Sequence, residues 1–243
     1  MSSYRIMAHM IPWYPDADRS RRVAQALMDA GVAYLEIQFP FSDPTADGPT
    51  IQAACSTALE RGFSLAAGWE FVAELADAGA PPIFVMSYAS PVYTTGVERF
   101  VRKAAEIGVR GLIVPDLPFD ADEGLYAAGA EAGVAIVPVL APDTRPERLR
   151  ALGELSPRYV YASLRRGITG TRTEIGPENI AFLDRVRTLG GEVMAGFGIV
   201  ERDQVAALAE HCEVAVVGSA LVRSIPEVGD PYDPVHALAS SLV

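Results

Sequence analysis

The sequence alternates strand-like and helix-like segments along almost its whole length. Eight short apolar runs, rich in β-branched and aromatic residues, are each followed by a loop and by a stretch whose apolar residues recur every three or four positions. The expected strands are residues 4–11, 34–40, 81–88, 111–116, 134–140, 159–164, 193–199 and 214–222. Near-continuous apolar strands are typical of a parallel sheet covered by helices on both faces. The pattern therefore predicts an α/β fold.

Eight strand-helix units at nearly even spacing favour a single-domain (β/α)8 TIM barrel over residues 1–243. An open, doubly wound sheet is the alternative, but the first expected strand is not followed by the Gly-x-Gly-x-x-Gly turn of that fold. The chain has no linker or low-complexity tract that would mark a domain boundary. The expected helices lie near residues 51–62, 67–79, 97–108, 145–153, 177–189 and 202–211, with an Ala-rich helix ending at Gly133 and a last helix from residue 233.

Composition excludes several classes of protein. The 31 acidic and 20 basic residues give a net charge of −11, which argues against a general nucleic-acid-binding surface. No apolar run approaches the roughly 18 residues that a membrane span needs, and the first five residues do not resemble a signal peptide. The two cysteines, Cys55 and Cys212, lie far apart without metal-ligand spacing. We therefore expect a cytoplasmic globular protein.

The second expected strand carries an acidic residue among apolar ones. Successive side chains of a strand point to opposite faces, so Glu36 and Gln38 share one face while Leu35 and Ile37 share the other. On an enclosed face an ionised carboxylate is costly unless it is paired, and such a group is a candidate acid/base. Asp47 follows in the loop at the carboxyl end of this strand, the edge where parallel α/β proteins bind ligands. The alternative is a Glu paired with a buried base and an Asp that caps a turn.

Glycine-bearing turns follow the last three expected strands. They contain Gly167 and Gly170, Gly196 and Gly198, and Gly218 with Ser219. Exposed backbone N–H groups at such turns favour an anion, and barrels often bind phosphate there. A single glycine turn can equally be a tight connection and nothing more. Their convergence on one rim, which we expect opposite the Glu36 strand in barrel order, predicts a phosphorylated substrate held across the mouth.

Other chemistries have less support. His9, His211 and His236 are scattered, so the sequence indicates neither a metal site nor a nucleophile triad. Lysine is scarce, and Lys103 lies in a helical stretch rather than on a strand, where a Schiff-base aldolase would need it. We expect a reaction that requires no metal and no cofactor.

Three further polar residues end expected strands. Asp116 ends the fourth strand, but Pro115-Asp116-Leu117-Pro118 is typical of a turn in which the Asp caps backbone groups, and we favour that interpretation. Tyr88 and Tyr161 end the third and sixth strands, where packing and ligand binding are equally compatible with the pattern.

The loop after the second strand resembles a known family. Leu35-Glu36-Ile37 and the run Pro40-Phe-Ser-Asp-Pro-Thr-Ala-Asp-Gly-Pro49 are similar to the signature of the tryptophan synthase α-subunit family. The turns at 167–172, 196–199 and 217–220 match later motifs of that family in order and spacing. The resemblance covers nearly the whole chain.

The resemblance implies a carbon-carbon lyase of tryptophan biosynthesis. Such a barrel cleaves indole-3-glycerol phosphate by retro-aldol chemistry into indole and glyceraldehyde 3-phosphate, and passes indole to a β-subunit. By position, Glu36 would be the catalytic acid/base and Asp47 would face the indole N–H, with Tyr161 and Thr169 beside the site. The residues that would hold the phosphate are Gly170, Gly198, Gly218 and Ser219.

This sequence also departs from the family pattern. The usual N-terminal helix is not expected, because only about three residues precede the first strand. Trp13-Tyr14-Pro15 replaces a Gly-Asp-Pro turn, Leu164 replaces a serine, and Ser90 replaces an asparagine near the β-subunit interface. These changes predict a weak or absent partnership with a β-like subunit. Two alternatives stay open: an aldol or retro-aldol enzyme for a related phosphorylated substrate, and a catalytically weak partner protein.

Gln38 is the departure nearest to the expected chemistry, since the family has a small residue there. It is expected on the face of Glu36, roughly 6 to 7 Å closer to the mouth. Its amide can donate a hydrogen bond to Glu36 or to a substrate group. We therefore expect Gln38 to bind substrate and to alter specificity.

Overall fold

The computed structural model describes residues 4–165 and 172–243. Within these residues all strands pair in parallel in a single sheet, in the order β5-β4-β3-β2-β1-β9-β8-β7-β6. The strands are β1 Ile6–Met10, β2 Tyr34–Gln38, β3 Ile83–Met86, β4 Gly111–Ile113, β5 Ala135–Val137, β6 Val139–Leu140, β7 Tyr159–Ser163, β8 Glu192–Gly196 and β9 Val214–Val217.

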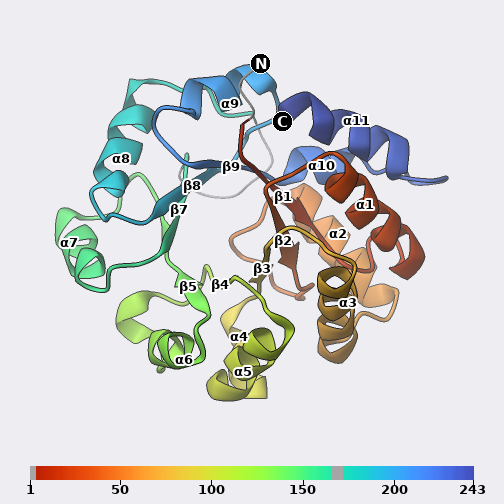
Figure 1. Ribbon diagram of the computed structural model, residues 1–243, viewed down its shortest axis with the longest axis horizontal. Helices are drawn as coiled ribbons and strands as arrows, with labels where there is room; N and C mark the ends of the chain where they lie inside the picture. The colour runs from red at the N-terminus through yellow and green to blue at the C-terminus, as the bar shows by residue number, and fades with distance from the viewer. Residues whose placement is uncertain (1–3, 166–171) are drawn as a thin grey trace.

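The helices surround the sheet (Figure 1). They are α1 Ala17–Asp29, α2 Pro49–Glu60, α3 Leu65–Asp77, α4 Ala89–Thr95, α5 Val97–Ile107, the 3-10 turn η1 Phe119–Ala121, α6 Leu125–Ala132, α7 Pro146–Glu154, α8 Pro177–Arg187, α9 Arg202–Leu208, α10 Ser219–Ser224 and α11 Tyr232–Leu242. None of the described helices combines the length and the apolarity needed to cross a bilayer. The predicted TIM barrel is confirmed.

The barrel has one seam, at Pro138. The expected strand 134–140 is divided there into β5, which pairs with β4, and β6, which pairs with β7. Proline has no N–H to donate to a sheet ladder. Its carbonyl still accepts a hydrogen bond from the Tyr161 N–H, at 2.9 Å. The two edges of the sheet are therefore joined through the chain itself, which leaves the barrel nearly closed.

The largest differences from the sequence-based expectation concern one strand and one helix. The run 214–222 is a strand only to Val217, because the chain turns at Gly218 and Ala220, Leu221 and Val222 form the buried face of α10. Helix α4 was not expected. A short apolar run is compatible with a strand or with a buried helix, so periodicity could not separate them.

The core has two layers that follow the alternation of the strands. Leu35 and Ile37 of β2 pack in the outer layer between sheet and helices, together with Val72 of α3. Tyr34 of the same strand points into the barrel, where it belongs to a second cluster with Tyr159. The interior face of β2 therefore also carries Glu36 and Gln38, as predicted.

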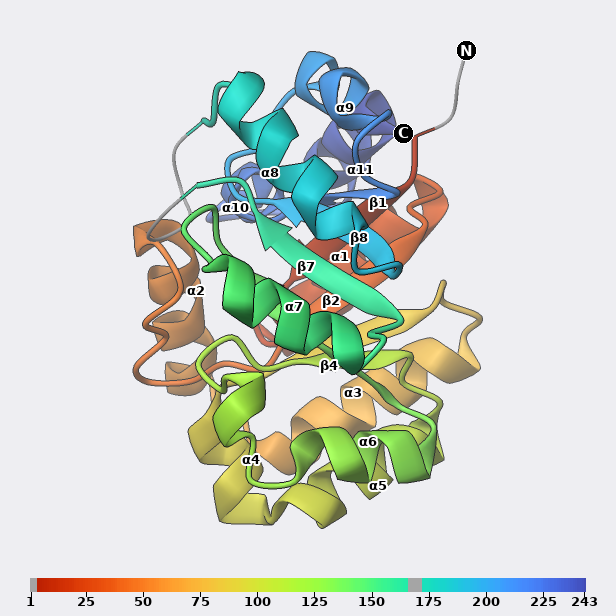
Figure 2. The same ribbon diagram turned by 90° about the vertical axis from the view of Figure 1, so that its left-hand side faces the viewer.

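Aromatic and charged side chains close one end of the barrel. Tyr34 packs edge-on against Phe84 and Tyr159, with ring centroids 5.4 and 6.5 Å away. Arg5 binds the Tyr34 hydroxyl and Glu192, the latter at 3.0 Å. Figure 2 shows β7 pointing away from the side seen in Figure 1, so Figure 1 looks onto the amino-terminal ends of the strands.

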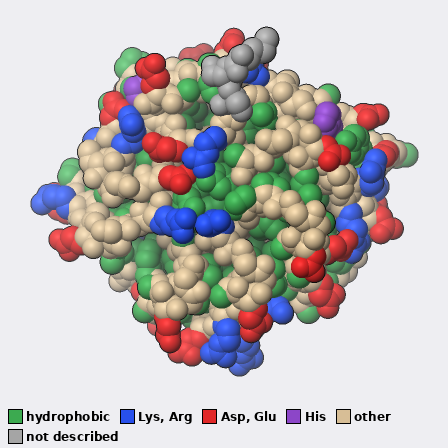
Figure 3. Space-filling view, in the orientation of Figure 1, with side chains coloured by type: hydrophobic (Ala, Val, Ile, Leu, Met, Phe, Trp, Pro, Cys, Tyr) green, Lys and Arg blue, Asp and Glu red, His purple; other side chains and the backbone are tan. Residues whose placement is uncertain are grey.

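Figure 3 shows that same end filled by hydrophobic side chains at its centre, with charged ones beside them over β7 and β8. The interior is thus blocked at the amino-terminal end. A ligand has to enter from the carboxyl ends of the strands.

Candidate active site

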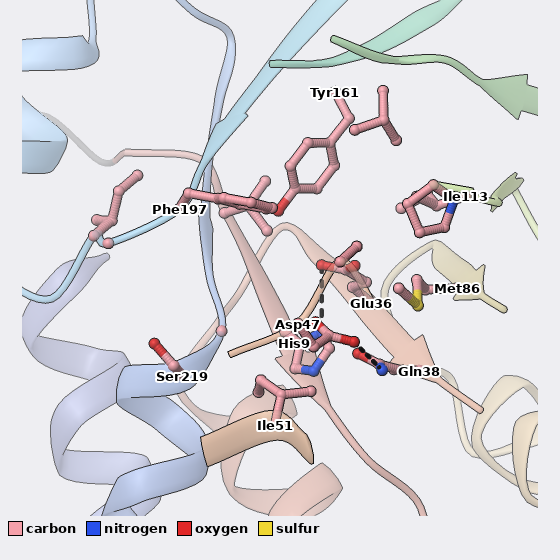
Figure 4. Close-up of a pocket in the computed structure, with 17 residues that line it drawn as sticks. His9, Glu36, Gln38, Asp47, Ile51, Met86, Ile113, Tyr161, Phe197 and Ser219 are labelled. Atoms are coloured by element: carbon pink, nitrogen blue, oxygen red, sulfur yellow. Dashed lines mark hydrogen bonds and ion pairs between the residues drawn. The ribbon is translucent and has the colours of Figure 1, made fainter. Parts of the chain in front are cut away.

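A pocket lies inside the barrel on the side of the carboxyl ends of the strands (Figure 4). Side chains from β1 and β2 face others that come from β7 and from the loops after β8 and β9. The residues that line the pocket are His9, Glu36, Gln38, Ala46, Asp47, Ile51, Met86, Ile113, Pro115, Val139, Tyr161, Phe197, Gly198, Ile199, Val216, Gly218 and Ser219.

Glu36 lies in this pocket with only 5% of its surface exposed. The parallel register places it directly beside His9 of β1, and the His9 Nδ1 to Glu36 Oε2 distance is 3.5 Å. Oε2 is buried and has no hydrogen-bond donor among the described residues. A carboxyl group that lines a pocket and is not held by strong donors can exchange a proton with a ligand.

Asp47 reaches the same pocket from the loop between β2 and α2. The loop folds back because the Asp47 N–H donates to the Pro44 carbonyl, at 3.0 Å, and because Gly48 and Pro49 begin the helix. Asp47 Oδ2 accepts hydrogen bonds from the Tyr88 hydroxyl and from Gln38 Nε2, both at 2.7 Å. The carboxylate is thus held in one orientation by two donors.

Opposing influences act on the pKa of Asp47. Burial raises its pKa, while the hydrogen bond from Tyr88, the nearby His9 and the hydrogen bond from Gln38 lower it; the net pKa is above the ordinary value. Tyr88 is affected in return, since burial and the Asp47 carboxylate raise the pKa of its hydroxyl. The Tyr88 proton therefore stays on the phenol and remains available to Asp47.

Gln38 lies on the same face as Glu36, as predicted, but its amide N–H points elsewhere. It donates to Asp47, and Nε2 also lies 3.5 Å from Cys55 Sγ. The other end of the amide, Oε1, is buried and has no donor among the described residues. Gln38 therefore holds Asp47 rather than Glu36. Its Oε1 is an unpaired acceptor beside the cavity.

Only some residues of the predicted glycine turns line the pocket. Gly198, Gly218 and Ser219 line the pocket, whereas Gly196 does not; a Cβ on Gly196 would lie 2.5 Å from the Tyr161 hydroxyl oxygen, so this glycine makes room for that ring. Thr169 and Gly170 lie outside the described residues.

The rim is also closer to Glu36 than the sequence suggested. The expectation that these turns lie opposite the Glu36 strand is wrong for the last one, because β9 is separated from β2 by β1 alone. Gly218 therefore lies next to β1, where a Cβ on it would be 3.6 Å from the Cβ of His9.

Aromatic and apolar side chains form the remaining walls. Tyr161 of β7 is 7% exposed, and burial, then Glu36 and Asp47, raise the pKa of its hydroxyl. Its ring meets that of Phe197 edge-on at 6.2 Å. Met86 and Ile113 face them across the cavity (Figure 4). These walls suit a flat apolar group beside the two carboxylates.

Two residues of the site had been undervalued at the sequence level. His9 is one of three histidines scattered along the sequence, yet its alternation with Met7 on β1 indicates that it faces the barrel interior. Tyr88 had been left open between packing and binding, and it serves as a donor to Asp47.

Other candidates lie outside the pocket. Asp116 accepts a hydrogen bond from the Ala89 N–H at 2.9 Å, so it caps backbone groups. Lys103 pairs with Glu106 on the outside of α5. Leu164 packs in the outer core. Among the residues that the structure describes, no group of three His, Cys, Asp or Glu side chains is placed to hold a metal ion.

Comparison with known proteins places this site in a family. Residues 4–239 match the family model described as tryptophan synthase alpha chain. The chain belongs to this family. The tryptophan synthase alpha chain of Helicobacter hepaticus is 35% identical over 246 residues, covering 96% of this chain and 92% of the relative. That of Synechocystis is 37% identical, covering 92% and 85%.

Solved structures of the tryptophan synthase alpha chain family share the fold. A chain of Mycobacterium tuberculosis tryptophan synthase superposes with a TM-score of 0.89 at 35% identity, covering 98% of this chain and 91% of that one. The tryptophan synthase A-subunit of Pyrococcus furiosus also gives 0.89, at 32% identity, covering 98% and 97%.

Proposed function

We propose that Glu36 and Asp47 are the catalytic carboxylates with which this alpha chain family member cleaves indole-3-glycerol phosphate to indole and glyceraldehyde 3-phosphate. The observation that carries the proposal is the meeting of two buried acids, one from β2 and one from the following loop, in one pocket near the carboxyl ends of a parallel barrel. The enzyme is a carbon-carbon lyase.

The reaction requires two proton movements and no net change in protonation. The bond between the indole ring carbon and the glyceryl carbon breaks, and its electrons are captured when the ring carbon is protonated. The neighbouring hydroxyl loses its proton as it becomes the aldehyde. Glu36, buried beside His9 in the wall of the pocket, is suited to give the first proton and to take the second.

Asp47 would stabilise the positive charge that develops near the ring nitrogen. Tyr88 and Gln38 hold its carboxylate in place before substrate arrives, so little reorganisation is needed during the reaction. The indole ring would lie between Tyr161 and Phe197 on one side and the apolar side chains across the pocket on the other.

The phosphate would bind at the glycine rim. Among the described residues that line the pocket, none is Lys or Arg, so backbone N–H groups are the available donors there. Gly198, Gly218 and Ser219 line the pocket and would supply such donors. The resemblance adds Gly170 and Thr169, which lie outside the described residues.

A related phosphorylated compound is a second candidate substrate. Gln38 Oε1 is buried without a donor among the described residues, and a substrate that carries an extra N–H or O–H group would satisfy it. Tests of substrate analogues that bear such a group would distinguish the two candidates.

We also propose that the chain docks on a β-like subunit, since a Pyrococcus furiosus relative with a TM-score of 0.88 was solved as a tryptophan synthase complex. The replacements at Ser90 and at Trp13-Tyr14 favour a weakened interface. A cytoplasmic location stays a prediction; the free, buried thiols of Cys55 and Cys212 are compatible with it.

The decisive experiment is to incubate the purified protein with indole-3-glycerol phosphate and to measure both products. Native protein should release indole and glyceraldehyde 3-phosphate in equal amounts. Glu36→Gln should lose roughly 10²- to 10⁴-fold in kcat, because the amide keeps the shape of the side chain but exchanges no proton. Glu74→Gln, which alters an exposed acid paired with Arg21, is the matched control. Native kcat in Glu36→Gln would exclude Glu36 as the acid/base.

A further inference from the structure

His9 is the imidazole that borders the pocket, and its closest charged group is Glu36. It is 6% exposed, points into the barrel from β1, and lies beside Glu36 in the parallel register. Nδ1 lies 3.5 Å from Glu36 Oε2, as the dashed line in Figure 4 shows. Nε2 is buried and has no hydrogen-bond partner among the described residues. A buried imidazole with one nitrogen toward a carboxylate and the other unpaired is an unfavourable arrangement in a core that only packs.

The elements around His9 bring few other titratable groups to it. Asp47 approaches from the loop after β2, and Tyr161 from β7 across the pocket, while Tyr88 lies behind Asp47. Neighbouring β9 and α10 supply groups that do not titrate, namely Val216, Gly218 and Ser219. Helix α1 packs on the opposite, outer face of β1. The protonation of His9 is therefore coupled mainly to Glu36 and then to Asp47.

Two opposing influences act on the charge of His9. Burial lowers its pKa, whereas the charge and the close carboxyl group of Glu36 and the charge of Asp47 raise it; the pKa lies above the ordinary value of 6.5. The His9 imidazole therefore keeps its proton to higher pH than an ordinary histidine, with the Glu36 carboxylate 3.5 Å away.

We propose that His9 is a proton-sharing positioning residue for Glu36, acting through Glu36 rather than on the substrate. This inference rests on the proposed function. The proton held by His9 passes to Glu36, and from Glu36 to the ring carbon as the carbon-carbon bond breaks. Glu36 then takes the proton of the hydroxyl and returns it to His9. One proton is given and one is recovered, so the pair ends each turnover as it began.

A pH profile distinguishes proton sharing from packing. His9→Asn keeps a polar group beside Glu36, and His9→Phe keeps a ring, but neither can hold the proton. Both variants should lower kcat about tenfold or more with a smaller change in KM. The alkaline limb of log kcat should move to lower pH by about 1 unit or more, since an imidazole retains its proton to higher pH than a lone carboxyl.

His211→Asn is the matched control. It removes another histidine paired with a carboxylate, Asp184 at 3.0 Å, but on the outside of the barrel. Its kcat and pH profile should equal those of the native protein. If either His9 variant keeps the native pH profile, whatever its stability, the proposal is overturned.

An NMR titration of the imidazoles tests the pair without any substrate. The midpoint of His9 should fall by about 1 to 3 pH units in Glu36→Gln, because the opposite charge is removed while burial remains. The midpoint of His211 should stay unchanged. An unchanged His9 midpoint would refute proton sharing even if the protein cleaves indole-3-glycerol phosphate. If the His9 midpoint falls in Glu36→Gln but the native protein does not cleave this compound, only the proposed function is refuted.

Discussion

The hydrogen bond from Tyr88 to Asp47 makes a quantitative prediction about stability. Tyr88→Phe removes only the hydroxyl, which is fully buried and donates to Asp47 Oδ2 at 2.7 Å. Hydrogen bonds to charged groups contribute about 1.5 to 3 kcal/mol. The same hydroxyl accepts the Ala46 N–H at 3.1 Å, a neutral bond that contributes about 1 kcal/mol. At neutral pH we expect Tyr88→Phe to lower the free energy of unfolding by about 2.5 to 4 kcal/mol.

The loss should depend on pH, and its sign follows from Asp47. Because the folded-state pKa of Asp47 is raised, ionising Asp47 costs stability as pH rises through that pKa, and the Tyr88 donor reduces the cost. In Tyr88→Phe the pKa of Asp47 rises further, because one donor to the carboxylate is lost. At pH values above that pKa, the variant bears the whole free-energy cost of the lost donor. Below the folded-state pKa of Asp47 the carboxyl is protonated in both folded proteins, and only neutral bonds are lost, at about 2 kcal/mol or less.

Urea unfolding of native protein and Tyr88→Phe at about pH 7 and at an acidic pH below the folded-state pKa of Asp47 measures the difference directly. The exposed Tyr93→Phe on α4, 40% exposed, should change stability by less than about 0.5 kcal/mol at either pH. Equal losses for Tyr88→Phe at the two pH values would show that Asp47 is not the charged partner of this hydroxyl, and the reasoning about the pocket would fail.

Three further outcomes are expected. Gln38→Gly should lower kcat/KM for indole-3-glycerol phosphate by about tenfold, because it removes one of the two donors that hold Asp47; a higher kcat/KM would mean that Gln38 acts mainly on specificity, through the space that it fills. Gly198→Ala should raise KM for that compound about tenfold or more and weaken competitive inhibition by inorganic phosphate, because φ at Gly198 is +83°; an unchanged KM would contradict a phosphate site there. A β-subunit from a family member should bind this chain weakly in calorimetry and more tightly after Ser90→Asn; tight binding by the native chain would show that the replacements are tolerated.

The fold could be predicted because parallel strands buried on both faces need continuous apolar runs, and helices between them need a period near 3.6. The predicted strand boundaries were wrong where an apolar run is compatible with both a strand and a buried helix, as in residues 214–222. The division at Pro138 carried a visible signal, since proline in a central strand removes a ladder donor.

Glu36 and Asp47 could be found because an acid on the inner face of a strand and an acid in the next loop must meet at one edge. His9 was missed because a lone histidine is ambiguous until the alternation of β1 is considered. Gln38 binds Asp47 rather than Glu36 because the loop ending at Pro49 folds back over β2. The spacing of residues along the chain does not reveal how far this loop folds back.

The seam at Pro138 also divides the barrel into two arcs, β1 to β5 and β6 to β9, that share a continuous ladder on only one side, between β1 and β9. Local opening requires the fewest broken ladder bonds at such a place, so amide hydrogens of β5 and β6 should exchange before those of β1. Val139, just beyond the seam, lines the pocket. If the barrel widens around an incoming ligand, it should do so along this line, away from the paired strands that carry His9 and Glu36.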